Sequence, residues 1–407
     1  MKIFITGIGG ISAAGRNITE HLESFQLMKR NAGTVSLFDT SLSYPVFEVK
    51  SPLINKQINK QKNEMRTLSL AMFALKEALH DAGLQKNLSG IKTGVCFGTS
   101  VASQLNDIDF YRTYRNTGAA DMASVDRFLK GNLAEAVAKS IKANGPSVTV
   151  VNACSSGADA IGVALSWLRN GVCDIAIAGG ADELNRIPLC GFGALGILSK
   201  SLCRPFDKDR SGLNLGEGAG VLILETEKSA SLRGKKSALL LAGYGAAGDA
   251  YHLTAPRPDG SGLESALRKS FADANITPQD VCFVNAHGTA THDNDKVEGI
   301  VLEKVFGSEI KFLSTKGYTG HTLGAAGGLE AAFTASALRE CWIPASAGFV
   351  QQDDDIPIKP ITEQTQINGS FAVSTSLAFG GNNASIVIAR VLDHLKIGHD
   401  LVKEWGS

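Results

Sequence analysis

A cysteine placed between a predicted strand and a predicted helix is the strongest chemical signal in the sequence. Cys154 lies in NACSSG (152–157), which follows the β-branched run 147–153 and precedes the small-residue run 156–171. A thiol at the first turn of a helix is close to free backbone N–H groups and to the positive end of the helix dipole, and both favour the thiolate. Because the flanking serines and glycine are small, a substrate has room to reach the sulfur. These features favour a nucleophilic cysteine.

Two histidines stand in comparable positions. His287 lies in NAHGTATHDND (285–295), at the end of an apolar run, and His321 lies in STKGYTGHTLGAAGG (314–328), just before a predicted helix. One such histidine is more often structural, but two of them with Cys154 allow two chemical interpretations. The first is a metal site, although no two of these residues have the short spacing typical of metal ligands. The second is a nucleophile with two hydrogen-bond donors, which suits an acyl oxygen that becomes negative.

The elements that must position these residues follow an α/β pattern, in which short β-branched runs alternate with alanine-rich helical runs. The segments 149–169 and 311–339 each predict a strand, a polar turn and a small-residue helix. We interpret them as an internal duplication of one α/β unit. The predicted strands include 2–9, 92–100, 174–182, 220–226, 237–245, 281–289 and the hairpin 371–391, and the predicted helices are 66–83, 156–171, 262–274 and 323–341.

A glycine-rich segment imitates a dinucleotide-binding motif. GYGAAG (243–248) matches G-x-G-x-x-G after a predicted strand, but the motif requires a helix next. Pro256, Pro258 and Gly260 follow closely, so no helix of useful length begins there. The earlier GIGGIS (7–12) lacks the third glycine. Both segments are therefore expected to form glycine-rich turns.

Composition excludes several classes of protein. The chain of 407 residues carries 40 Lys+Arg and 40 Asp+Glu, and this balance argues against nucleic acid as the main partner. No apolar run approaches the ~18 residues of a membrane span, and the glycine-interrupted N-terminus is unlike a signal peptide. The seven cysteines are scattered without a C-x-x-C pair, which predicts reduced thiols in a cytoplasmic enzyme without disulfides or a metal site.

Taken together, these segments resemble the β-ketoacyl-acyl carrier protein synthases. The resemblance covers nearly the whole chain and implies the thiolase fold: an α/β architecture of two duplicated halves, 1–230 and 231–407, in five αβαβα layers, normally dimeric. The order and spacing of that family are found in NACSSG, RPFDKDRSGLNLGEGAG (204–220), DAYHLTAP (249–256), NAHGT, STKGYTGH with GAAGGLE, and AFGGNN (378–383).

The resemblance implies a decarboxylative condensation. Cys154 would take an acyl chain from the phosphopantetheine arm of an acyl carrier protein, and the backbone amides of Cys154 and Phe379 would form the oxyanion hole. His287 and His321 would promote decarboxylation of malonyl-carrier protein and stabilise the enolate, giving a 3-oxoacyl product two carbons longer without a resident cofactor. The resemblance further implies a structural ion pair of Lys316 with Glu330 that sets His321 and the local field. It also implies pantetheine-binding hydroxyls at Thr289 and Thr291 and supporting carboxylates at Asp295 and Glu298.

The same resemblance raises questions of partner and pathway. Acidic carrier proteins need a basic docking patch. The stretch 55–66 matches a docking region of relatives, although a solvated helix entry explains its charge as well. Residues 99–146, which shape the dimer face in relatives, diverge here. We therefore expect a specialised synthase, of aryl polyenes or other polyketides, as a homodimer or as a heterodimer with a cysteine-less chain-length factor. The docking candidates are Lys56, Lys60, Lys62 and Arg66.

Two other functions, a thiolase that uses coenzyme A and a non-catalytic partner subunit, fit the sequence less well. A thiolase that uses coenzyme A would have a second catalytic cysteine near the C-terminus, but the last cysteine, Cys341, stands outside any glycine turn. A non-catalytic partner subunit would have replaced the nucleophile, whereas Cys154, His287 and His321 are all present. The sequence therefore predicts an acyltransferase.

Overall fold

The computed structural model describes residues 1–50, 65–85, 88, 90–103, 108–123, 125–126 and 132–391. The predicted docking residues Lys56, Lys60 and Lys62 and the C-terminal tail lie outside these ranges.

Two five-stranded halves with the same strand order make up the main sheet. The N-terminal half has the order β3-β2-β4-β5-β1, and the C-terminal half has the order β8-β7-β11-β12-β6. The strands of the first half are β1 (Ile3–Ser12), β2 (Thr93–Gly98), β3 (Ser147–Val150), β4 (Ile175–Asp182) and β5 (Gly218–Thr226). Those of the second are β6 (Leu239–Gly248), β7 (Val281–Asn285), β8 (Phe312–Leu313), β11 (Phe371–Ala378) and β12 (Asn382–Arg390).

Strand directions repeat as well. In the first half β2 runs parallel to β3 and β4, and β5 is antiparallel to β4 and β1. In the second half β7 runs parallel to β8 and β11, and β12 is antiparallel to β11 and β6. Within the sheet, β1 and β6 join the two halves through one residue pair, Phe4 with Leu240. The predicted duplication is confirmed.

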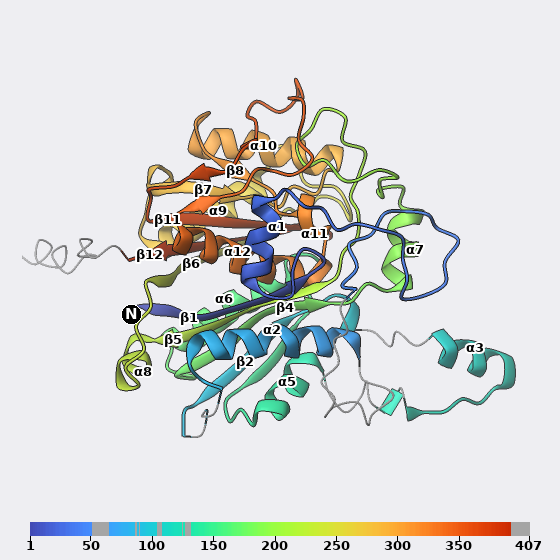
Figure 1. Ribbon diagram of the computed structural model, residues 1–407, viewed down its shortest axis with the longest axis horizontal. Coiled ribbons are helices and arrows are strands. Elements are labelled where there is room, and N and C mark those ends of the chain that lie inside the picture. Colours follow the sequence, from blue (N-terminus) through green and yellow to red (C-terminus); the bar gives the residue numbers. More distant parts are fainter. Residues whose placement is uncertain are drawn as a thin grey trace, which may run out of the picture.

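The five strands of each half form one layer, and these layers are called the first sheet (N-terminal half) and the second sheet (C-terminal half). Helices form three further layers around them, so that Figure 1 shows five layers from top to bottom. Three separate hydrophobic clusters fill the spaces between the layers. The helices on the outer face of the first sheet are α2 (Arg66–Ala82) and α5 (Leu133–Ile141). The central layer holds α6 (Ser156–Arg169) and α12 (Ala326–Glu340), and the outer layer of the second sheet holds α9 (Ser261–Ala274) and α10 (His292–Phe306).

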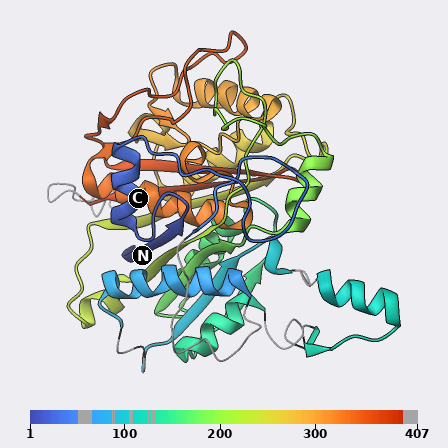
Figure 2. The same ribbon diagram turned by 45° about the vertical axis from the view of Figure 1, so that its right-hand side comes forward.

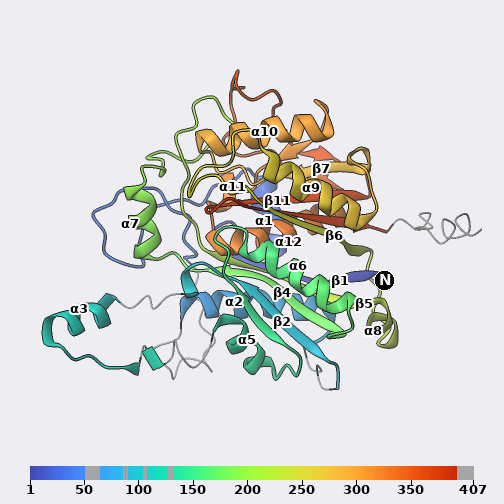
Figure 3. The same ribbon diagram turned by 180° about the vertical axis from the view of Figure 1, so that it is seen from behind.

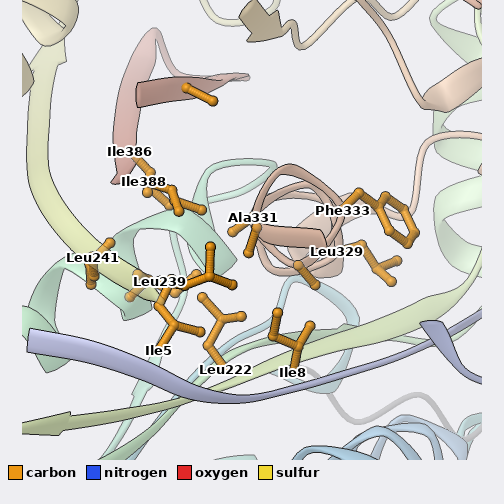
Figure 4. Packing of buried hydrophobic residues seen from close by; sticks show 14 of the residues in the cluster. Ile5, Ile8, Leu222, Leu239, Leu241, Leu329, Ala331, Phe333, Ile386 and Ile388 are labelled. Carbon is orange, nitrogen blue, oxygen red and sulfur yellow. The ribbon is translucent and has the colours of Figure 1, made fainter. Parts of the chain in front are cut away.

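The central layer explains why the predicted helices 156–171 and 323–341 are rich in small residues. Ala331 and Leu329 of α12 pack between Ile5 and Leu222 of the first sheet and Ile386 of the second (Figure 4). A helix enclosed by two sheets is apolar on all sides. Small side chains let both sheets come close to it.

The two glycine-rich segments lie inside strands, so their prediction as turns was wrong. Gly7 and Gly9 face α2 from β1, and Gly245 faces α9 from β6. A Cβ at these glycines would collide with the helix backbone, at the carbonyl oxygens of Ala78, Ala74 and Ala266 respectively. Glycine is used at both places for the close approach of helix and strand, which is one more sign of the duplication.

Several shorter elements lie outside the predicted set. The predicted boundary at 230/231 falls within α8, so the connection between the halves comes later, at 233–238. The divergent region 99–146 contains α3, which stands away from the body (Figures 2 and 3). The helices are α1 (Ile18–Gln26), α3 (Ile108–Thr117), α7 (Arg186–Ala194), α8 (Glu227–Leu232) and α11 (Lys316–Thr319), with 3₁₀ turns η1 (Val101–Ser103), η2 (Pro278–Asp280) and η3 (Leu323–Ala325). The small strands β9 (Trp342–Ile343) and β10 (Thr365–Gln366) pair with each other.

Within the described part of the chain, none of the helices combines the length and the apolar character needed to cross a membrane.

Candidate active site

Cys154 lies in a tight turn between β3 and the N-terminus of α6, as predicted. Its side chain is buried, with 5 % exposure. The preceding Ala153 has a left-handed backbone with φ of 49°, which few non-glycine residues adopt. The Ser156 hydroxyl donates to the Ala153 carbonyl at 2.6 Å and accepts from the Asn152 N–H at 2.8 Å. The strained turn is thus held by the small residues around the cysteine.

A buried carboxylate supports this turn from behind. Asp159, one turn into α6, accepts hydrogen bonds from the Asn152 amide at 2.5 Å and from the Ser155 hydroxyl at 2.8 Å. Its other oxygen accepts from the Tyr244 hydroxyl of β6 at 2.6 Å. The nucleophile turn is therefore tied to the C-terminal half of the molecule.

One predicted histidine, His321, contacts the cysteine, and the other, His287, lies beside His321. The Nε2 atom of His321 lies 3.0 Å from the Cys154 sulfur. The rings of His287 and His321 are perpendicular, at an interplanar angle of 89°, with centroids 5.3 Å apart. Backbone bonds fix His321, since its N–H donates to Asn214 O at 2.8 Å and its carbonyl accepts from Gly216 N at 3.0 Å. The duplicated strand ends thus bring the three residues together.

Lys316 sets the orientation of His287. Its buried ammonium group donates to the His287 carbonyl at 2.6 Å, to His287 Nδ1 at 3.1 Å and to the Glu330 carboxylate. An ammonium group has only donors, so Nδ1 of His287 accepts and the ring proton resides on Nε2. His287 therefore presents an N–H to the site.

Two buried carboxylates of α10, Glu298 and Asp295, accept hydrogen bonds from the backbone of the turn after β7. Glu298 accepts the backbone N–H groups of His287 and Gly288, both at 2.8 Å, and Asp295 accepts that of Ala290 at 3.1 Å. Their side chains thus point at the backbone of the turn and support His287 indirectly.

Burial keeps the reacting groups neutral. It raises the pKa of the Cys154 thiol to about 11, against a smaller opposing effect of the Lys316 charge. The expected thiolate at the helix end is therefore opposed by desolvation. Burial and Lys316 also lower the pKa of His287 and His321 well below 6.5. The pKa of Glu330 rises to about 7 because burial outweighs the pull of Lys316.

Phe379, expected to supply an N–H to the oxyanion hole, lines the cavity together with Cys154. It follows β11 in a turn with Gly380 and Gly381, whose φ values of 88° and 79° favour glycine. Its backbone N–H has a small lowering effect on the pKa of the Cys154 thiol, which burial outweighs. Its ring stacks on Phe192 of α7, with centroids 5.5 Å apart and an interplanar angle of 15°. Sequence reasoning missed Phe192, because α7 showed no clear periodicity.

A cavity of about 280 Å³ leads to Cys154 and His321. Thr289 and Thr291 line it, and their hydroxyl oxygens are 2.9 Å apart. Apolar residues of α7 and of the following turn, including Phe192 and Leu195, form part of its wall. The cavity is open to solvent, so a substrate can approach the sulfur through it.

Arg66 has a different position from the one proposed for carrier docking. Its guanidinium forms two hydrogen bonds to Glu217, at 2.6 and 2.7 Å, and one to Val49 O at 2.8 Å. These bonds anchor the start of α2 to the sheet. The Arg66 guanidinium therefore binds residues of its own chain.

Comparisons with known proteins agree with this site. The model "Beta-ketoacyl synthase, N-terminal domain" matches residues 1–230, and "Beta-ketoacyl synthase, C-terminal domain" matches residues 239–350. The chain is 32 % identical over 408 residues to 3-oxoacyl-[acyl-carrier-protein] synthase 2 of Staphylococcus aureus (strain MRSA252), covering 96 % of this chain and 98 % of the relative.

Solved structures with the same fold include "The ishigamide ketosynthase/chain length factor", with a TM-score of 0.89, 29 % identity and coverage of 96 % of this chain and 99 % of that one. Another is "AntDE:AntF (apo): type II PKS acyl-carrier protein in complex with its ketosynthase bound to the hexaketide", with a TM-score of 0.86, 25 % identity and coverage of 96 % and 99 %. The thiolase-like fold is confirmed. The chain belongs to the β-ketoacyl synthase family and is a condensing acyltransferase.

Proposed function

We propose that this chain is a 3-oxoacyl-[acyl-carrier-protein] synthase in which Cys154 carries the growing acyl chain. The observation that carries the proposal is the 3.0 Å contact of its sulfur with His321 Nε2, beside the perpendicular ring of His287. In the first step the sulfur attacks the acyl thioester carbon, the bond to the pantetheine sulfur breaks, and the thiol proton passes to that leaving group. The N–H of Phe379 and that of Cys154 stabilise the carbonyl oxygen as it becomes negative.

Malonyl-carrier protein enters for the second step. Its carbon–carboxylate bond breaks, CO₂ leaves, and the electron pair forms an enolate. Neutral imidazoles at His287 and His321 donate hydrogen bonds to that oxygen without protonating the carbanion. The carbanion then attacks the acyl carbon and expels the Cys154 thiolate, which takes a proton from solvent. Lys316 is a positioning residue here, because it fixes the His287 tautomer.

The cavity supports delivery on a phosphopantetheine arm. Thr289 and Thr291 offer paired hydroxyls at the cavity wall for the amides of the arm. Both substrates arrive on that arm, and neither the acyl transfer nor the condensation needs an oxidant or a metal, so the proposal includes no resident cofactor. A cytoplasmic location is part of the proposal, because Cys154 must stay a free thiol.

The reaction is tested by product analysis. The wild-type protein is given an acyl-carrier protein and malonyl-carrier protein, and the carrier-bound product is identified by mass. A 3-oxoacyl chain two carbons longer is expected, with no product from Cys154→Ala. Equal product from that variant would contradict the assignment.

A thiolase that uses coenzyme A finds less support. Of the described residues that line the cavity, Cys154 is the only cysteine. The N-terminus of α12 is the end near His321, and its 15 residues span about 22 Å. Cys341 follows the C-terminus of this helix, so it lies at the end away from the site.

We also propose that the chain works as a dimer with a ketosynthase-like partner, a chain-length factor. The edge strand β3 and the turn after it expose Val148 and Val151, at 41 % and 55 %. Helix α3 has no buried residue and exposes Tyr111 and Tyr114. Exposed apolar residues on an open sheet edge favour pairing with another chain. The ketosynthase and chain-length-factor pairing named for the ishigamide structure supports this partner.

Native mass spectrometry of the chain co-expressed with its genomic neighbours tests the partner. A one-to-one complex with a ketosynthase-like neighbour is expected. A stable homodimer that binds none of the neighbouring gene products would exclude a chain-length factor as the partner and would identify the homodimer as the working assembly.

A further inference from the structure

We propose that Asp182 is a positioning residue for the first half-reaction: its carboxylate fixes the loop that supports Cys154 against the loop that carries His321. The inference rests on the proposed function, because it concerns transfer of the acyl chain to Cys154.

Asp182 ends β4 and is fully buried, with 0 % exposure. Its Oδ1 accepts from the Thr99 hydroxyl at 2.5 Å and from Val101 N at 2.8 Å. Its Oδ2 accepts from Ser100 N at 2.8 Å and from Gly324 N at 2.6 Å. One carboxylate therefore binds two loops that are more than two hundred residues apart in the sequence.

The first loop, residues 99–101, supports the nucleophile. The Ser100 hydroxyl donates to the carbonyl oxygen of Ala153 at 3.1 Å. Ala153 is the residue with the left-handed backbone directly before Cys154. A shift of this loop would therefore move the turn that aims the sulfur.

The second loop carries His321. Gly324 comes three residues after His321 and follows Leu323, another non-glycine residue with a left-handed φ, of 54°. A Cβ at Gly324 would lie 2.7 Å from Ser100 N and 2.8 Å from Asp182 Oδ2, so the two loops touch here. The supports of both Cys154 and His321 thus meet at Asp182.

The donor set requires a carboxylate. Backbone N–H groups approach both oxygens, and neither Val101 N nor Gly324 N can turn into an acceptor. The isosteric change Asp182→Asn places an NH₂ group against one of these donors and leaves it unpaired. One loop is then released while the side-chain volume is kept.

The test is the rate of acyl transfer from an acyl-carrier protein to full-length protein, followed by rapid quench and intact mass. Asp182→Asn is expected to lower the rate constant of acyl transfer at saturating carrier at least tenfold. The rate constant is normalised to the fraction of protein in which iodoacetamide labels Cys154. The carrier concentration at half saturation is expected to stay within twofold of wild type, because Asp182 touches no substrate.

Glu225→Gln is the matched control. Glu225 is another fully buried carboxylate, bonded to Ser229 and Arg233 at the opposite end of the sheet's strands. It should keep the wild-type rate constant per labelled site. A rate constant for Asp182→Asn within twofold of wild type, a loss shared equally by Glu225→Gln, or a change confined to half saturation would overturn the proposal.

Ser100→Ala tests the same path if Asp182→Asn does not fold. It keeps the backbone N–H bond to Asp182 and removes the hydroxyl that donates to Ala153, so a threefold to tenfold slower transfer is expected at unchanged half saturation. A wild-type rate would overturn the proposal. Absence of acyl transfer in the wild-type protein would instead contradict the proposed function itself.

Discussion

The chemistry of single residues in this site is governed by burial. Cys154, His287 and His321 are held neutral by desolvation, and Lys316 beside them is buried with 1 % exposure. Neutral imidazoles donate hydrogen bonds without delivering a full proton, which suits enolate chemistry. The residue types and their proximity were predicted from the sequence. Their neutral state was not, because it depends on packing from both halves.

The Lys316–Glu330 pair gives one prediction at this scale. Lys316→Met leaves the Glu330 carboxylate buried without its cation, and His287 loses the donor that sets its tautomer. The variant is expected to lose about 3–5 kcal/mol of stability in urea unfolding. The double variant Lys316→Met with Glu330→Leu should recover part of that loss. A double variant that is less stable than the single one would contradict the account.

His21 gives a pH prediction away from the site. Burial lowers its pKa from 6.5 to about 4 in the folded protein, where its ring contacts the Ser12 hydroxyl at 2.7 Å. Between those values the unfolded chain binds the proton and the folded chain does not, so stability falls as pH falls from 6.5 towards 4. This difference corresponds to about 3 kcal/mol. Urea midpoints should show the wild-type advantage over His21→Gln shrinking across this window. A constant gap would contradict it.

At the scale of elements, the duplicated strand–turn–helix unit positions the site. The α6 and α12 N-termini meet behind Cys154 and His321, where a Cβ at Gly157 would lie 2.7 Å from Gly328 N. Periodicity and turn residues predicted these helices and strands well. The glycine-rich parts of β1 and β6 were mispredicted as turns, since the helices that pack on them are far away in the sequence. The network of Asp159 and Asp182 was missed for the same reason.

Gly157 gives the prediction at this scale. Gly157→Ala forces α6 away from α12, and we expect a stability loss of about 2 kcal/mol or more with at least tenfold slower condensation. Gly191→Ala is a matched helical control, because a Cβ there meets nothing within 4 Å. It should be neutral or stabilising, since alanine has the higher helix propensity. Thermal melting and condensation rates of the two variants check this. Equal behaviour would contradict it.

At the scale of the molecule, the two halves build one site, and β3 lies at an edge of the main sheet. The open edge of β3 and the projecting α3 offer an apolar surface beside the nucleophile turn. The sequence alone marked residues 99–146 as divergent but did not predict α3. None of the residues of α3 is buried, so the helix has no apolar face packed on a core that a pattern would reveal. The dimer proposal depends on this surface.

Charge placed on that edge tests it. Val148→Asp is expected to shift the protein towards the monomer, because an unpaired carboxylate would be buried at the interface. Leu232→Asp is the control, since Leu232 lies on α8 with 81 % exposure. Light scattering after gel filtration measures both. An unchanged assembly for Val148→Asp, or a monomer for both variants, would exclude β3 as the contact.

The central claim is that Cys154 carries the acyl chain, and the most direct measurement is intact-protein mass after mixing with a panel of acyl-carrier proteins, followed by malonyl-carrier protein. We predict one acyl adduct on the wild-type protein, mapped to Cys154, absent from Cys154→Ala, and discharged when malonyl-carrier protein is added. An adduct that maps to another cysteine, or that persists in Cys154→Ala, would contradict the account.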